Sequence, residues 1–184
     1  MEKKSVSRET LSSPSVVAGL HAVQVVNPRQ VELMRQVRNI CRGTYAYDNT
    51  EISPHEQRAW WRNNRSRVRA YLYYEQGAVL IGFGLLRIES DLRWWDSLGV
   101  LPVYRGHGYG SAITTDLALR AAGQVWSSVL ASNVPAQRMH RPELWEEVKR
   151  DGRLVVYRTR LDKWETSPTP TPTPTQLSLS PTSP

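Results

Sequence analysis

The segment Arg105–Ser111, Arg-Gly-His-Gly-Tyr-Gly-Ser, combines three glycines with a cation in a spacing that suits phosphate binding. A helix N-terminus leaves several backbone N–H groups unpaired and carries a partial positive charge, so a glycine-rich loop beside it lets the main chain wrap around a phosphate. Arg105 adds a permanent cation at the edge of the loop. We predict a phosphate-binding loop that suits a pyrophosphate, and we expect His107 to border the bound group.

These glycines also fit other interpretations. Glycines at Gly106, Gly108 and Gly110 are also typical of a plain strand-to-helix turn. The segment lacks the Lys-Ser/Thr ending of a P-loop, and no acidic residue about 20 positions further on completes a dinucleotide-binding fingerprint. Both nucleotide-binding interpretations are therefore disfavoured.

The longer string Leu98–Ser111 resembles the acetyl-CoA motif of the GNAT superfamily of N-acetyltransferases. The residues that match the motif, in order, are Val100, Pro102, Arg105, Gly108 and Gly110. The resemblance implies that acetyl-CoA is the co-substrate and that the main-chain amides of Gly106–Ser111 bind its pyrophosphate. It also implies that Val100 and its strand neighbours bind the pantetheine arm.

A second motif of the same family, Asn-x-x-Ala-x-x-x-Tyr, is matched in part further along the chain. This sequence has Asn133 and Ala136, but His140 stands where the family has tyrosine. The resemblance implies that Asn133 lies near the pantetheine and that residue 140 lies near the sulfur. An imidazolium at His140 could protonate the departing thiolate. Without the motif, His140 is typical of a partly exposed histidine at a helix end.

The resemblance implies direct attack of a neutral primary amine on the acetyl thioester, for which the enzyme must supply a base. Glu89, Asp91 and Asp96 are the candidates, because they lie on or near strands that would border the acceptor cleft. We prefer Asp96, which precedes the end of the cofactor-binding strand. Each of the three is also typical of a solvated carboxylate in a turn.

A basic, aromatic segment lies upstream of these carboxylates. It contains Arg58, Arg62, Arg65, Arg67 and Arg69, interleaved with Trp60, Trp61 and Tyr71. Such side chains contact phosphates and stack on bases, so Arg58, Trp61, Arg62 and Arg65 are predicted acceptor or nucleic-acid contacts. A solvated, salt-bridged helix face is the alternative. Three functions fit these residues. The protein is a transferase for a small amine or a protein amino group, a transferase for an amino-bearing base in DNA or RNA, or a non-catalytic nucleic-acid-binding module.

The composition agrees with a globular protein that has an anionic partner. The 184 residues carry a formal net charge of +7 and include one cysteine, Cys41, so no intrachain disulfide is expected. The sequence shows no signal peptide and no apolar stretch long enough to cross a bilayer, which favours the cytoplasm. Four scattered histidines show no metal-ligand spacing, so no metal is expected. The seven tryptophans would permit a homodimer.

The elements that must position these residues alternate between strands and helices. Strands are predicted at 21–26, 68–74, 78–88, 94–100, 125–130 and 154–161, and helices after Pro28, after Ser53, after Gly110 and over 142–150. Residues 76–77 predict a hairpin turn, and Ser53 with Glu56 predicts a capping box. The order indicates one α/β domain over 21–163, which the resemblance makes a GNAT-like mixed sheet with flanking helices. Residues 1–20 are expected to be flexible, and the Pro/Thr/Ser-rich tail 164–184 to be disordered.

Overall fold

The computed structural model describes residues 19–160 except for 48, 76–77, 90–92 and 122. The expected flexible N-terminal segment, apart from its last two residues, and the Pro/Thr/Ser-rich tail lie outside the described residues. In chain order the elements are β1 (His21–Gln24), α1 (Pro28–Cys41), the short 3-10 helix η1 (Arg42–Thr44), α2 (Pro54–Asn64), β2 (Val68–Glu75), β3 (Val79–Ile88), β4 (Trp94–Val100), the 3-10 helix η2 (Pro102–Tyr104), α3 (Tyr109–Arg120), β5 (Val125–Leu130), α4 (Val134–Gln137), β6 (Trp145–Arg150) and β7 (Leu154–Thr159).

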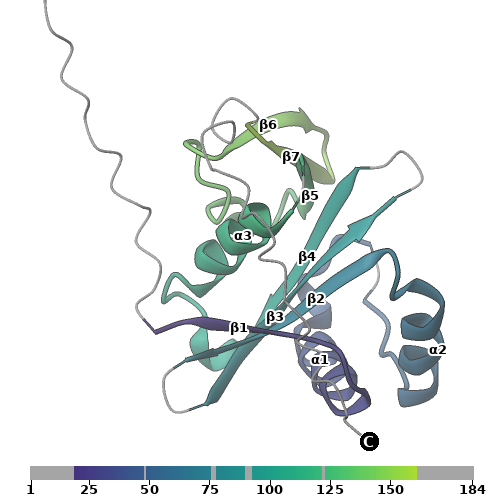
Figure 1. The fold of residues 1–184 in the computed structure, drawn as a ribbon. Helices are drawn as coiled ribbons and strands as arrows, with labels where there is room; N and C mark the ends of the chain where they lie inside the picture. The colour runs from purple at the N-terminus through teal and green to yellow at the C-terminus, as the bar shows by residue number, and fades with distance from the viewer. Residues whose placement is uncertain (1–18, 48, 76–77, 90–92, 122, 161–184) are drawn as a thin grey trace, which may run out of the picture.

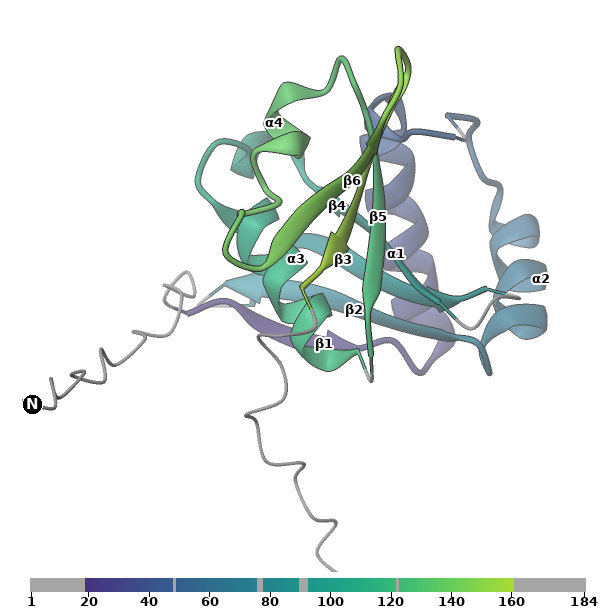
Figure 2. The ribbon, with the colours of Figure 1, turned by 90° about the horizontal axis from the view of Figure 1, so that it is seen from above.

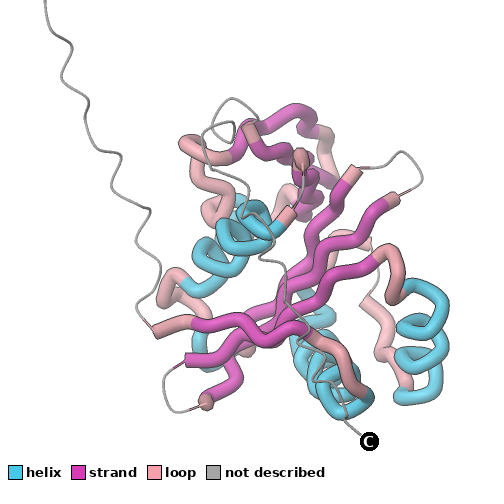
Figure 3. The backbone as a smooth tube through the Cα atoms, in the orientation of Figure 1, coloured by secondary structure: helices cyan, strands magenta, loops and turns pink. Residues whose placement is uncertain are grey.

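The strands form one mixed sheet in the order β1-β2-β3-β4-β5-β7-β6 (Figures 1 and 3). The pairs are antiparallel except β4–β5, which is parallel. The predicted hairpin is confirmed as β2 paired with β3, although its turn at 76–77 lies outside the described residues. The sheet confirms the predicted α/β class and its GNAT-like arrangement.

The parallel pair at the centre of the sheet is short. Strand β4 pairs with β5 only at Trp94–Val125 and Trp95–Trp126. Beyond this point β4 continues to Val100 and β5 to Leu130, and the described residues show no further pairing between them. The two strands therefore diverge toward the end at which the predicted phosphate loop begins.

Helices cover both faces of the sheet (Figure 2). Alternate residues of β2 show why, because successive side chains of a strand point to opposite faces. Ala70 and Leu72 belong to the core beneath α1, whereas Tyr71 and Tyr73 belong to the core beneath α3. The sheet is thus the middle layer, with α1 and α2 on one side and α3 on the other.

Both helices on the first side begin with a complete capping box. At α2, Ser53 Oγ accepts a hydrogen bond from the Glu56 amide at 3.2 Å, and Glu56 Oε2 accepts one from the Ser53 amide at 2.8 Å. This confirms the predicted capping box. Helix α1 has the same arrangement between Asn27 and Gln30, which the sequence analysis did not identify.

The helix predicted over residues 142–150 is wrong. Residues Trp145–Arg150 form strand β6, which pairs antiparallel with β7 at the edge of the sheet. The Trp145 side chain is 2% exposed in the core, whereas most of the following residues are exposed. Charged residues such as Glu147 and Lys149 favour a helix locally, but pairing with β7 and burial of Trp145 override that preference.

Matched leucine substitutions in α3 test this packing. Leu117 is fully buried, whereas Leu119 on the same helix is 56% exposed. We expect Leu117→Ala to lower the free energy of unfolding by about 2–5 kcal/mol, because it removes buried apolar contacts and leaves a cavity. Leu119→Ala should change it by less than about 0.5 kcal/mol. Urea denaturation measures both, and equal losses would contradict the described packing of α3.

Candidate active site

A large cleft, of about 1300 Å³, runs through the sheet where β4 and β5 diverge. Its walls in the sheet come from both diverging strands: Asp96, Leu98, Gly99 and Val100 of β4, and Ser127 and Val129 of β5. On the side of α3 it is lined by Arg105, Gly106, Gly108, Ser111, Met139 and His140. On the other side it is lined by Met34, Arg38, Tyr45, Ile52, Gln57 and Trp60. The cleft can therefore receive one ligand from each face of the sheet.

The predicted phosphate loop forms the α3 side of this cleft. Gly106 and Gly108 have left-handed backbone angles, with φ of 83° and 84°, which glycine adopts without strain. Gly108 is the N-cap of α3 and supplies no side-chain hydrogen bond to the first turn. Amides at such an uncapped helix start offer an anion site. Arg105 is exposed beside them, and its Nε donates to the Val100 carbonyl at 3.1 Å.

The first turn of α3 is braced against the segment after α4. A Cβ at Gly110 would overlap Met139 Sδ, so any larger residue would require the Met139 side chain to move. Ser111 Oγ donates to the Met139 carbonyl at 3.3 Å and accepts from Arg141 Nε at 2.9 Å. The Ser111 hydroxyl is thus engaged within the protein, and the predicted contact of Ser111 with the cofactor is through its amide.

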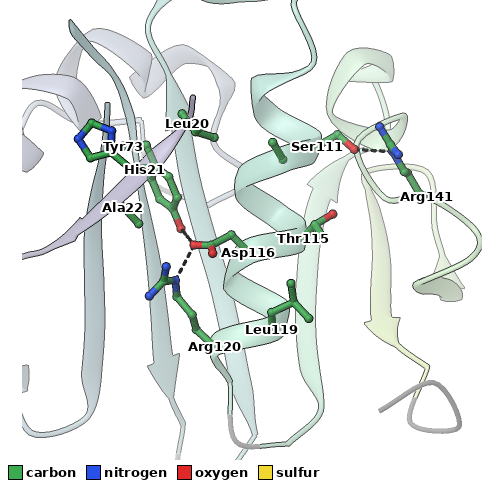
Figure 4. Close-up of a pocket in the computed structure, with 11 residues that line it drawn as sticks. Leu20, His21, Ala22, Tyr73, Ser111, Thr115, Asp116, Leu119, Arg120 and Arg141 are labelled. Atoms are coloured by element: carbon green, nitrogen blue, oxygen red, sulfur yellow. Dashed lines mark hydrogen bonds and ion pairs between the residues drawn. The ribbon is translucent and has the colours of Figure 1, made fainter. Parts of the chain in front are cut away.

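A second, smaller cavity of about 310 Å³ lies along α3 beside β1 (Figure 4). The polar side chains in this cavity form hydrogen bonds with one another. Asp116 Oδ2 accepts one from the Tyr73 hydroxyl at 2.7 Å and one from Arg120 Nε at 2.6 Å. Tyr73 is 1% exposed, and burial raises its pKa, so its hydroxyl remains protonated. These internal pairs make the smaller cavity a weaker candidate for the reaction site than the larger cleft.

Asn133 and His107 lie at the edges of the predicted cofactor site. Asn133 lines the cleft, but its Oδ1 accepts from the Ala136 amide at 3.2 Å and so caps α4, while its Nδ2 donates to the Thr44 carbonyl at 3.4 Å. His107 is exposed and does not line the cleft; its ring bonds the Arg105 carbonyl at 2.9 Å. Their contacts with the cofactor stay predictions.

Asp96 lies at the point where the two strands part. It follows Trp95, the last residue of β4 that pairs with β5, and its Oδ2 is buried without a hydrogen-bond partner among the described residues. Burial raises the pKa of Asp96 to about 7, although a hydrogen bond with Ser127 opposes the shift. A carboxyl group that titrates near neutral pH is suited to general-base catalysis.

The other two candidate bases are placed differently. Glu89 lines the rim of the cleft just after β3 and forms an ion pair with Arg87. Both side chains are substantially exposed, at 38% for Glu89 and 45% for Arg87. Asp91 lies outside the described residues. Of the two candidates among the described residues, Asp96 is the one in the interior of the cleft.

His140 lines the cleft but is only 7% exposed. Its ring stacks on Tyr157 at 4.3 Å between centroids and meets the edge of Trp145 at 4.8 Å. Its Nδ1 lies 3.1 Å from the Ala136 carbonyl, which can only accept, so Nδ1 carries the hydrogen. Burial lowers the pKa of His140 to about 4, so the ring is neutral at pH 7. This environment does not support the imidazolium expected from the sequence.

Tyr45 is a cleft residue that sequence reasoning missed. It follows η1, and its hydroxyl is buried without a partner among the described residues. A Cβ at Gly99 would lie 2.8 Å from this hydroxyl and 3.1 Å from Cys41 Sγ, so the ring reaches β4. No local pattern marks Tyr45, because its position depends on how α1 packs against the sheet.

The structure divides the basic, aromatic segment. Arg58, Arg62 and Arg65 are exposed on or next to α2, and Trp61 packs against the core beneath α1 without lining the cleft. The aromatic cleft residue from this helix is its neighbour Trp60. The more distant Arg69 does not belong to this surface: its Nη1 donates to the Arg120 carbonyl at the end of α3.

A mixed sheet with diverging central strands and an uncapped, glycine-rich helix start beside them defines an acyl-CoA-binding type of domain. The family model of the acetyltransferase (GNAT) family matches residues 34–142, and the chain belongs to this family. It is an N-acetyltransferase with acetyl-CoA as its co-substrate. The sequence matches no curated protein.

Solved structures with low sequence identity share the fold. A GNAT superfamily phosphinothricin acetyltransferase from Sinorhizobium meliloti, in complex with acetyl-CoA, is 15% identical with a TM-score of 0.63, over 76% of this chain and 87% of that one. The spermidine N-acetyltransferase of Vibrio cholerae, in complex with CoA and spermine, is 14% identical with a TM-score of 0.62, over 77% and 94%. A ribosomal-protein-alanine N-acetyltransferase from Brucella melitensis is 17% identical with a TM-score of 0.60, over 76% and 99%.

Two further observations concern only the described residues. They contain no cluster of three or more potential metal ligands. In the same part of the chain, none of the helices combines the length and apolar character needed to cross a membrane.

Two alanine substitutions test the phosphate loop. A Cβ at Gly106 would meet nothing within 4 Å, so Gly106→Ala changes only the backbone preference at a φ of 83°. Alanine pays about 1–2 kcal/mol to adopt the left-handed conformation that cofactor binding requires. We therefore expect the Kd of acetyl-CoA, measured by calorimetry, to rise roughly 5- to 30-fold. Gly152→Ala is the control, because its Cβ also meets nothing and its φ is not left-handed. Unchanged binding by Gly106→Ala would contradict this role.

The raised pKa of Asp96 predicts how stability depends on pH. In the unfolded chain the carboxyl ionises near its ordinary pKa, whereas in the folded protein it keeps its proton until about pH 7. Wild-type stability is therefore lost as pH rises between these values, and Asp96→Asn avoids that loss. We expect the stability gain of Asp96→Asn to be roughly 2–3 kcal/mol larger at pH 8 than at pH 5. Urea denaturation measures it, with exposed Glu143→Gln as control; a pH-independent difference would rule out the raised pKa.

Proposed function

We propose that this acetyltransferase moves the acetyl group of acetyl-CoA to a primary amine by direct attack. The observation that carries the proposal is the cleft that runs through the sheet between β4 and β5. Acetyl-CoA would bind from the α3 side through the amides of Gly106–Ser111, while the acceptor enters from the side of α1 and α2. Holding both reactants in one passage supports a single transfer step without a covalent enzyme intermediate.

The acceptor side of the cleft favours a small amine or a single amino group on a flexible chain. Its walls include apolar side chains from three elements and a connecting loop: Met34, Ile52, Trp60, Phe83 and Leu85. Polar groups such as Arg38, Gln57 and the Arg87–Glu89 pair lie among these apolar walls. Apolar walls with a few polar groups among them suit an amine on an alkyl or aromatic stem.

Asp96 is the proposed general base. Its carboxyl lies at the closed end of the gap between β4 and β5, with one oxygen unpartnered. A pKa near 7 gives a substantial ionised fraction at neutral pH while keeping the carboxylate basic enough to take a proton from the attacking amine. Glu89 is the alternative base, but it is paired with Arg87 at the rim of the cleft.

A nucleic-acid acceptor is the second candidate. Arg58, Arg62 and Arg65 are exposed around α2, the same helix that supplies Trp60 to the cleft, and the formal net charge is +7. A polynucleotide on this surface could present an exocyclic amino group to the cleft. Transfer of labelled acetyl into single-stranded DNA or RNA, lost in Arg62→Ala, would favour this candidate over a small amine.

The acceptor screen follows from the related structures, whose names include spermidine, phosphinothricin and ribosomal-protein alanine N-acetyltransferases. CoA release should be measured with spermidine, phosphinothricin, an alanine-ended peptide and single-stranded polynucleotides. With the best acceptor, we expect kcat/KM to rise with pH to a plateau above about 7, because Asp96 must be ionised to act as a base.

Asp96→Asn should abolish this rise of kcat/KM with pH and lower kcat/KM by about 10²- to 10⁴-fold. The titration of the acceptor amine affects wild type and variant alike, so their difference isolates Asp96. Glu89→Gln is the control variant. If Glu89→Gln abolishes the rise of kcat/KM with pH while Asp96→Asn retains it, the base is Glu89. No acceleration with any acceptor would refute the proposed transfer to an amine.

A further inference from the structure

Three side chains that line the cleft keep a buried polar atom without a partner among the described residues. These atoms are the Tyr45 hydroxyl, Asp96 Oδ2 and His140 Nε2. A buried polar group without a hydrogen bond is destabilising, so such groups are expected to meet a ligand or to serve the reaction. Asp96 is the proposed base, which leaves the proton donor for the departing sulfur to be found.

His140 is poorly suited to be that donor. Because its Nδ1–H donates to the Ala136 carbonyl, Nε2 holds a lone pair and can only accept. The ring is fixed in this orientation between Tyr157 and Trp145. A second proton on the ring is opposed by burial, which lowers the pKa of His140 to about 4. The position of the family tyrosine is therefore occupied by an acceptor.

The Tyr45 hydroxyl is a donor on the opposite wall of the same cleft. It lies next to Gly99, where a Cβ would be only 2.8 Å from the oxygen. Burial raises the pKa of Tyr45, so the hydroxyl keeps its proton across the neutral range. The ring is held by the neighbouring Arg38 guanidinium, 5.5 Å from its centroid. Among the described residues, Tyr45 thus offers a protonated, unpartnered hydroxyl beside β4.

The order of residues along β4 matches the order of the reacting atoms. A pantetheine arm that starts at the phosphate loop passes Val100 and Gly99 before it reaches Asp96. With the arm bound in this direction, the sulfur would lie on the Gly99 side of the acetyl carbon and the amine on the Asp96 side. Three residues of strand span roughly 10 Å. That length fits an acetyl carbon under attack by the amine, with one hydrogen bond of about 3 Å at the sulfur and another at the amine nitrogen.

We propose that the Tyr45 hydroxyl donates the proton that the CoA sulfur receives when the thioester breaks, an assignment that rests on the proposed function. The amine nitrogen bonds to the acetyl carbon and passes one proton to Asp96. The carbon–sulfur bond then breaks, its electron pair stays on sulfur, and the Tyr45 proton moves to it. Solvent carries the proton from Asp96 back to Tyr45, so the products are the acetylated amine and CoA thiol.

The test compares Tyr45→Phe with Tyr71→Phe, which removes a tyrosine hydroxyl outside both cavities. Hydroxylamine is the acceptor probe, because its size makes it independent of acceptor specificity; acetohydroxamate and CoA thiol are measured above the uncatalysed rate. We expect Tyr45→Phe to lower kcat 10-fold or more with an unchanged Kd for acetyl-CoA. Its Tm should equal or exceed that of wild type, because the lost hydroxyl has no partner. Tyr71→Phe should keep wild-type kcat.

The possible outcomes separate this assignment from the proposed function. Wild-type kcat in Tyr45→Phe overturns the assignment while the transferase activity stands. A lower Tm together with weaker acetyl-CoA binding shows that Tyr45 is structural, which also overturns it. A wild-type protein that binds acetyl-CoA but accelerates neither hydroxylamine nor any amine refutes the proposed function itself. A lower kcat in His140→Gln than in Tyr45→Phe would assign the donor to residue 140 instead.

Discussion

The divergence of β4 and β5 is the constraint on which the site depends. Parallel neighbours in a sheet normally pair along their whole length, yet these two pair only at Trp94–Val125 and Trp95–Trp126. The backbone groups of β4 that face the gap need other partners, since unpaired buried amides and carbonyls are costly. An extended, amide-containing cofactor arm could supply those partners, which is the binding mode that the proposed function assigns to the gap.

The protein gives up some stability at this site. Tyr45, Asp96 and His140 each bury a polar atom that no described residue satisfies. In the smaller cavity the polar side chains are paired with one another, as in the Tyr73–Asp116–Arg120 set along α3. The contrast between a satisfied and an unsatisfied cavity distinguishes a structural polar cluster from one prepared for ligands.

Local chemistry made several elements predictable. The phosphate loop, the capping box at Ser53 and the β2–β3 hairpin each follow from residues close together in the chain. The helix predicted over 142–150 was wrong because the charged residues there favour a helix by themselves. Burial of Trp145 and pairing with β7 decide the structure of this segment instead. Edge strands of this kind have little sequence signal of their own.

The sequence alone determined the α/β class, the family resemblance and the cofactor loop, because glycine spacing and helix-start chemistry act over a few residues. Tertiary structure decided the rest. It brought Tyr45 from the segment after η1 to within reach of Gly99 on β4, buried Asp96 at the fork of two strands, and made His140 a neutral acceptor. These properties arise from contacts between distant segments and from burial, and neither can be read from residue spacing.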